Sequence, residues 1–205
     1  FRNQGDGTFV DIAAPAGVQN LRYTKGATWG DFDNDRFPDL YVSNLQSPNR
    51  LYRNQKDGTF TDVAVEKKVA GPMASFSTWF FDFDQDGVLD IFVASYDTSV
   101  AGWVNGYLGK PNVAERSALY RGIGQGEFLD VAGTLGLRRS VMAMGSNFGD
   151  FDDDGYPDIY LGTGSPNYEA LIPNIALWNR GGRRFDDVTT PSGLGHLQKG
   201  HGVSF

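Results

Sequence analysis

Cysteine is absent from the 205-residue sequence, and histidine occurs only twice. The lack of cysteine excludes disulfide bonds, thiolate catalysis and Cys-ligated zinc or iron–sulfur sites. Basic residues are in the minority, since 18 Lys and Arg face 25 Asp and Glu and leave a net charge of −7. Because nucleic acids and anionic membrane surfaces bind to basic faces, we expect neither as a partner. No apolar run approaches the length of a membrane span, so we also expect no membrane insertion.

Tandem repeats dominate what the sequence does contain. One motif recurs as GDFDNDRFPDLYVSN, FDFDQDGVLDIFVAS and GDFDDDGYPDIYLGT, and its leading aspartates Asp31, Asp82 and Asp150 are 51 and 68 residues apart. A second motif, GDGTFVDIA in its first copy, shows 51 and 68 as its first two intervals and 57 as its third. Its phenylalanines are Phe9, Phe60, Phe128 and Phe185. Two markers with the same spacing indicate one repeating structural unit.

Each unit predicts four short antiparallel strands. In the first full copy we expect strands at 27–32, 39–43, 50–54 and 59–64, with an Asp-Gly turn between the last two. No sustained 3.6-residue apolar period occurs, although a short helical piece at 64–69 is an open alternative. Four strands per repeat indicate an all-β fold, a β-propeller of four-stranded antiparallel blades. A β-solenoid is the second choice, because its repeats are shorter and contain no internal hairpin.

The repeat registers divide one partial propeller, residues 1–205, into units at about 1–51, 52–119, 120–177 and an incomplete 178–205. The opening FRN matches the third strand of a blade, and the closing KGHGVSF matches the start of a first strand. We therefore expect about three and a half blades. An open arc leaves strand edges and blade faces bare, so we expect the chain to continue in both directions or neighbouring copies to complete it.

Every copy of the first motif carries aspartates at positions 1, 3, 5 and 9 of a loop. They are Asp31, Asp33, Asp35 and Asp39; Asp82, Asp84, Asp86 and Asp90; and Asp150, Asp152, Asp154 and Asp158. Crowded carboxylates repel one another, so we expect cations to neutralise them. Alternating oxygen ligands suit Ca²⁺, with the position-7 carbonyls of Phe37, Val88 and Tyr156 as further ligands. Mg²⁺ fits less well because it prefers a rigid octahedral shell that keeps its waters. Solvated turns without any metal are the plainer alternative.

The sixth loop position is glycine in the second and third loops but Arg36 in the first, so we expect that site to be strained or weaker. These loops and their flanks, such as NRLYRNQKDGTFTDV, closely resemble the FG-GAP/VCBS repeat family over essentially the whole chain. That family includes integrin α-subunit heads and secreted proteins of the cartilage acidic protein type. The resemblance implies a propeller, usually seven-bladed, with structural Ca²⁺ in three D-x-D-x-D-x-x-x-D loops formed by the twelve aspartates and three carbonyls above.

The predicted function is a calcium-binding, secreted or cell-surface propeller that serves as a structural, adhesion or assembly module. Extracellular calcium is millimolar and would fill even weak sites. We expect a protein or polysaccharide partner at the cell surface or matrix, or self-assembly. No enzyme is predicted, because His196 and His201 lack the spacing of a helical zinc pair and no nucleophile or nucleotide motif occurs. The alternative is a carbohydrate-binding or carbohydrate-active propeller whose active residues lie outside this sequence.

An aspartate follows the phenylalanine of the second motif in every repeat. The four are Asp11, Asp62, Asp130 and Asp187. A catalytic residue is normally needed once, so recurrence in each blade predicts a structural hydrogen bond instead.

The second unit is 17 residues longer than the first (68 − 51), and the surplus lies within 96–117. We expect a Gly-rich loop there that presents Trp103 and Tyr107, with Tyr168 on a shorter stretch at the equivalent place of the next unit. Exposed aromatics on long loops suit sugar stacking or a protein partner, so these three are the candidate partner-binding residues. The alternative is that Trp103 and Tyr107 pack back onto the blade.

Overall fold

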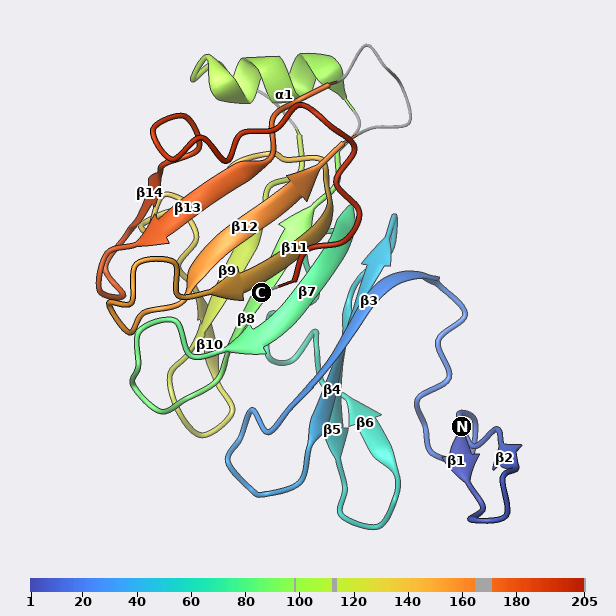
Figure 1. The fold of residues 1–205 in the computed structure, drawn as a ribbon. Helices are drawn as coiled ribbons and strands as arrows, with labels where there is room; N and C mark the ends of the chain where they lie inside the picture. Colours follow the sequence, from blue (N-terminus) through green and yellow to red (C-terminus); the bar gives the residue numbers. More distant parts are fainter. Residues whose placement is uncertain (98, 112–113, 165–170, 205) are drawn as a thin grey trace.

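The computed structural model describes residues 1–97, 99–111, 114–164 and 171–204 (Figure 1). This part of the chain forms one two-stranded sheet, three four-stranded antiparallel sheets and a single helix. The strands are β1 (Arg2–Asn3), β2 (Phe9–Val10), β3 (Tyr23–Gly30), β4 (Asp39–Leu45), β5 (Arg50–Asn54), β6 (Phe60–Asp62), β7 (Ser75–Phe81), β8 (Asp90–Ser95), β9 (Ala118–Gly122), β10 (Phe128–Asp130), β11 (Ala143–Gly149), β12 (Asp158–Thr163), β13 (Ile175–Asn179) and β14 (Phe185–Asp187). The all-β prediction is confirmed.

The three large sheets pair their strands in chain order, β3-β4-β5-β6, β7-β8-β9-β10 and β11-β12-β13-β14. Their first strands, β3, β7 and β11, lie next to one another, and the sheets fan out from them (Figure 1). Meandering sheets arranged in this way are the blades of a β-propeller, so the propeller prediction is confirmed. The small sheet β1–β2 pairs Asn3 with Phe9, the register in which β5 and β6 pair Asn54 with Phe60. It therefore corresponds to the outer two strands of a blade.

Apolar side chains fill the spaces between neighbouring blades. One cluster joins the first two blades and includes the fully buried Leu51 and Ile91. Another joins the second and third blades and includes Phe92 and Leu161. The second strands are the most deeply buried, and every residue of β8 is buried. Because the core lies between sheets, each blade depends on its neighbours for stability.

The inserted segment forms a helix, so the prediction of a Gly-rich loop is wrong for this part of the chain. Helix α1 (Val100–Tyr107) begins after Ser99, whose Oγ accepts a 3.0 Å hydrogen bond from the Gly102 N–H and caps the helix. Gly102 is required because the helix packs closely on Ala114, and a Cβ at this glycine would lie 2.8 Å from the Ala114 Cβ. The glycine that suggested a loop allows close packing instead.

The residues after the third blade form no strand within the described part, although KGHGVSF matches the start of a first strand. They run beside the third blade, where the Gly200 N–H donates to the Thr163 carbonyl (2.9 Å) and Asn147 Nδ2 donates to the Val203 carbonyl (3.3 Å). Residues 64–69 form turns and not a helix. Throughout the described ranges, no helix has the length and apolar character of a membrane span.

Candidate metal centres in the aspartate loops

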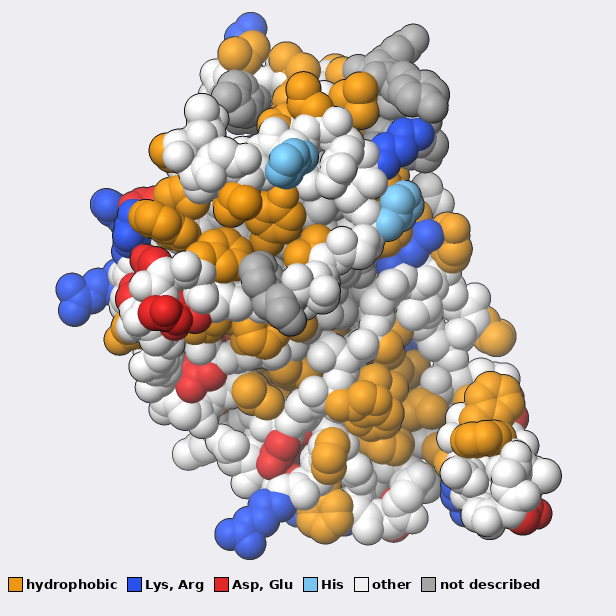
Figure 2. All heavy atoms as spheres, in the orientation of Figure 1, with side chains coloured by type: hydrophobic (Ala, Val, Ile, Leu, Met, Phe, Trp, Pro, Cys, Tyr) orange, Lys and Arg blue, Asp and Glu red, His pale blue; other side chains and the backbone are white. Residues whose placement is uncertain are grey.

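The three aspartate loops connect the first and second strands of their blades: β3 to β4, β7 to β8, and β11 to β12. All three lie on the same side of the arc in Figure 1, and Figure 2 shows acidic side chains in red over this side. The second and third loops touch, since the side-chain amide of Gln85 donates to the Gly155 carbonyl. The propeller thus places three acidic loops in a row.

Position 1 of each loop holds the backbone of the loop in a curl. In the first loop, Asp31 Oδ1 accepts from the Asp35 N–H (2.9 Å) and Asp31 Oδ2 accepts from the Arg36 N–H (2.7 Å). Asp82 and Asp150 make the same pair of bonds in their own loops. Each carboxylate oxygen keeps a lone pair for a further ligand, so this role is compatible with metal binding.

The sixth position adopts a left-handed backbone in every loop. Its φ is 81° at Gly87, 91° at Gly155 and 72° at Arg36. The left-handed region is strained for a residue with a Cβ and not for glycine. The strain predicted for the first loop is confirmed, whereas its weaker affinity stays a prediction.

Position 9 is fully buried in all three loops, and its carboxylate accepts two backbone hydrogen bonds. Asp90, for example, accepts from the Phe83 N–H (2.9 Å) and the Gly122 N–H (2.8 Å). Burial raises the pKa of Asp39 to about 6 and that of Asp90 to about 7, against these hydrogen bonds, and it raises the pKa of Asp158 as well. This aspartate therefore ties the loop to the third strand of its blade while carrying a charge that burial disfavours.

Position 3 lies beside an arginine in the first two loops. Arg53 Nε is 2.8 Å from Asp33 Oδ2, and Arg121 Nε is 2.7 Å from Asp84 Oδ2. The other oxygen, Oδ1, of each aspartate is buried without a hydrogen-bond partner among the described residues. The arginine therefore satisfies only part of each carboxylate.

The two arginines beside position 3 were not predicted from the sequence. Both occupy the fourth place of their third strand, in RLYRN and ALYRG, and the recurring Tyr-Arg pair was the available signal. The corresponding residue of β13 is Trp178, so the third loop has no such arginine.

Each loop brings three carboxylates close enough to share one ion. Oxygen atoms within 4.8 Å of one another come from Asp31, Asp33 and Asp39; from Asp82, Asp84 and Asp86; and from Asp150, Asp152 and Asp158. The fourth aspartate of each loop, namely Asp35, Asp90 or Asp154, lies outside its close set. The carbonyls of Phe37, Val88 and Tyr156 stay predicted ligands. Neither His196 nor His201 belongs to such a group among the described residues.

The first two loops are covered by the outer hairpin of the following blade. A Cβ on Gly126 would lie 3.1 Å from the Asp33 Cβ, and one on Gly182 would lie 2.6 Å from the Asp84 Cβ. The exposed fraction of the side chain is accordingly only 8% for Asp33 and 12% for Asp84, whereas Asp152 is exposed. Burial of a loop therefore follows from the packing of the next blade.

The recurring aspartates outside the loops have the predicted structural role. Asp11, Asp62 and Asp130 each accept a hydrogen bond from the N–H two residues later, at 2.9, 3.2 and 3.1 Å. Asp187 does the same with Thr189, at 3.0 Å. Such local bonds fix the turn after the fourth strand of each blade.

Of the candidate partner-binding residues, Trp103 is partly buried on α1. It packs against a small cluster of Tyr96, Met142 and Ile172, so it does not project freely from a loop. The side chain of Tyr107 and the whole of Tyr168 lie outside the described residues.

Comparison with known proteins finds the same repeat. Residues 1–42 and 31–93 match the family model of the FG-GAP-like repeat. Cartilage acidic protein 1 of Homo sapiens is 31% identical over 198 residues, which cover 91% of this chain and 27% of that protein. The Mus musculus protein of the same name is 30% identical over 181 residues, 83% of this chain and 26% of its own length.

The chain thus spans about a quarter of the length of these curated relatives. A Xenopus tropicalis protein of that name is 34% identical over 97 residues, 45% of this chain and 15% of the relative. Since the repeat match includes the first two aspartate loops and the similarity extends over 91% of the chain, the chain belongs to the FG-GAP-like repeat family.

Proposed function

We propose that each aspartate loop binds one Ca²⁺ and that the three ions stabilise this propeller. The observation that carries the proposal is Asp33, whose side chain is 8% exposed and whose Oδ1 accepts no hydrogen bond among the described residues. A buried carboxylate oxygen without a donor is costly, and a cation relieves that cost. The recurrence of the same three-carboxylate arrangement in every blade supports one ion per loop.

The ligands offered by these loops favour calcium. Every candidate is an oxygen, and Ca²⁺ takes 6–8 oxygens in flexible geometry, whereas Mg²⁺ demands near-ideal octahedral geometry. Positions 1 and 3 would supply ligands in each loop, joined by position 9 in the first and third loops and by position 5 in the second. The bound ion would supply two positive charges where several carboxylates lie close together. This is a structural contribution and not a catalytic one.

Calcium would couple the strands of a blade to the next blade. The loop joins the first two strands, position 9 bonds to the third strand, and the following outer hairpin covers position 3. Binding free energy at such a site becomes folding free energy.

The proposed biological role is an extracellular or cell-surface module for structure, adhesion or assembly, without enzymatic activity of its own. Support comes from recurring aspartates such as Asp62 and Asp130, which fix turns, and from the similarity to cartilage acidic protein 1. Weak sites, such as the one expected in the loop with Arg36, would be filled at millimolar calcium. A protein or polysaccharide at the cell surface or matrix, or another copy of the protein, is the proposed partner.

Thermal unfolding with excess CaCl₂ and with a chelator tests the calcium proposal. Saturation at 100 times Kd contributes about 2.7 kcal/mol per site, and a protein of this size gains about 2–4 °C per kcal/mol. We expect three sites to raise Tm by more than about 10 °C. Asp33→Asn and Asp84→Asn should each reduce the shift, whereas Glu66→Gln, at a side chain that is 70% exposed, should not. Equal Tm values with and without calcium would contradict the proposal.

A further inference from the structure

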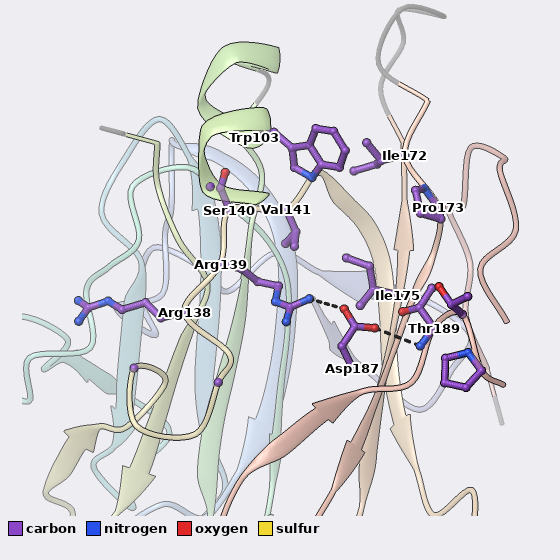
Figure 3. A pocket seen from close by; sticks show the side chains of 15 residues that line it. Trp103, Arg138, Arg139, Ser140, Val141, Ile172, Pro173, Ile175, Asp187 and Thr189 are labelled. Atoms are coloured by element: carbon purple, nitrogen blue, oxygen red, sulfur yellow. Dashed lines mark hydrogen bonds and ion pairs between the residues drawn. The ribbon is translucent and has the colours of Figure 1, made fainter. Parts of the chain in front are cut away.

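A cavity of about 580 Å³ lies between the second and third blades, below helix α1 (Figure 3). Its volume is within the range of small-molecule sites. Trp103 and Gly106 of α1 form its roof, and the segments around β13 and β14 form one wall. The described part of the first blade carries no such helix, so this roofed cavity is a feature of one position and not of every blade.

The wall of the cavity carries an ion pair that is open to a ligand. Arg139 Nη1 is 2.7 Å from Asp187 Oδ2, and the two side chains are 36% and 40% exposed. Figure 3 shows both side chains pointing across the cavity toward each other, whereas Arg138 points away from it. Burial works to raise the pKa of Asp187, but hydrogen bonds from Thr189 and the neighbouring Arg139 lower it overall, so the pair stays charged. The wall thus offers donors and acceptors side by side.

Ser140 adds a hydroxyl whose hydrogen-bonding capacity is unused. It lines the cavity, it is 8% exposed, and its Oγ has no hydrogen-bond partner within the described residues. Nearly all buried polar groups in proteins have a partner, which can be a ligand or an ordered water. A hydroxyl can donate and accept, so it fits another hydroxyl.

The roof of the cavity is apolar, and apolar side chains also line its walls. The indole of Trp103 lies next to Ile172 and above the ion pair in Figure 3, and Val141 and Ile175 also line the cavity. An aromatic ring above a polar wall is suited to a ligand with one apolar face and a polar edge.

These features discriminate between classes of ligand. An anion would meet the Asp187 carboxylate, and a cation would meet Arg139, because each charge is already paired with the other. A purely apolar ligand would bury this ion pair and the Ser140 hydroxyl without replacing their hydrogen bonds. A neutral ring with vicinal hydroxyls avoids all three penalties, since each hydroxyl both donates and accepts.

We propose that the cavity binds a neutral pyranose sugar, with an apolar ring face on Trp103 and ring hydroxyls on Arg139, Asp187 and Ser140. The site is independent of the aspartate loops, so it extends the proposed function and does not rest on it.

The test is a titration of the complete protein, with calcium present, with the methyl pyranosides of glucose, galactose and mannose and with glucuronate. The readout is the ¹H–¹⁵N resonance of the Trp103 indole. We expect a saturable shift with at least one neutral pyranoside and weaker binding of glucuronate. A glycan array then separates two sources of the sugar. Arrayed neutral glycans retain a protein that binds glycan termini, and they do not retain a protein that binds only free sugars.

Variants distinguish a binding role from a structural one. By isothermal titration calorimetry, which does not depend on the indole resonance, Trp103→Ala should weaken pyranoside binding about tenfold. Ser140→Ala should weaken it several-fold without lowering Tm, because the hydroxyl has no partner in the described structure. Trp29→Ala, which removes an indole that is 59% exposed on β3, should change nothing. Lack of any saturable shift, preference for glucuronate, or unchanged binding in Ser140→Ala and Trp103→Ala would overturn the proposal.

Discussion

Arg121 is expected to oppose calcium at the second loop, although it stabilises that loop without calcium. Its Nε is 2.7 Å from Asp84 Oδ2 and its Nη2 is 3.0 Å from Asp86 Oδ2. A calcium ion lies about 2.3–2.6 Å from each ligand oxygen. The guanidinium and an ion that shared an Asp84 oxygen would therefore be at most about 5 Å apart.

The repulsion between these two cations can be estimated. A single and a double positive charge about 5 Å apart in water repel by about 1.7 kcal/mol, and physiological salt screens roughly half of this. Arg121→Gln should therefore tighten calcium binding at the second loop by about three- to tenfold. The calcium-free variant should be less stable by about 1 kcal/mol, because it loses two partly exposed ion pairs.

Site-resolved NMR can measure this effect, since one backbone amide reports on each loop. The Gly87 N–H donates to Asp82 in the second loop, and the Gly155 N–H donates to Asp150 in the third. In Arg121→Gln, the calcium affinity measured from the Gly87 amide should rise, and the affinity measured from the Gly155 amide should not. Arg138→Gln serves as the control, because Arg138 is 57% exposed and 3.7 Å from Asp130, away from the loops. An affinity at Gly87 that falls would show that Arg121 orients Asp84 for the metal and would refute the reasoning.

Three more predictions concern the backbone, the pH and the helix. Arg36→Gly should raise the free energy of unfolding by about 0.5–1 kcal/mol in a urea titration, because it removes left-handed strain at φ 72°; a loss of stability would contradict this. The raised pKa of Asp90, about 7 against an ordinary value of 3.8, means that the folded calcium-free protein binds this proton more tightly than the unfolded chain does. The free energy of unfolding of the calcium-free protein therefore falls as the pH rises from about 4 through 7. With a chelator, Tm should thus be higher at pH 5.5 than at pH 8. The positive charge of a calcium ion in the same loop opposes the binding of this proton, so calcium should reverse this order; the same order in both conditions would count against Asp90. Ser99→Ala should remove the cap of α1 and speed amide exchange in that helix about fivefold, whereas Ser99→Thr should retain the cap.

Repetition in the sequence was sufficient to predict the blades and the gathering of carboxylates in each loop. Copies of one motif, such as those that begin at Asp31 and Asp82, report the same local structure several times, which fixes strands and turns despite weak individual signals. The insertion occurs once and lacks this support. Helix α1 was missed because the cost of Gly102 in a helix is visible in the sequence, whereas its packing on Ala114 is a tertiary contact. The arginine at position 3 was missed for the same reason, because a strand pattern does not show which loop a side chain reaches.

The covering of the first two loops, each by the next blade, gives the arc a direction. Gly126 of the second blade closes over Asp33 of the first, and Gly182 of the third closes over Asp84 of the second. Damage to the outer hairpin of one blade should thus be felt at the metal of the blade before it as well as at its own. Calcium occupancy of the first two loops would then report whether the following blade has docked.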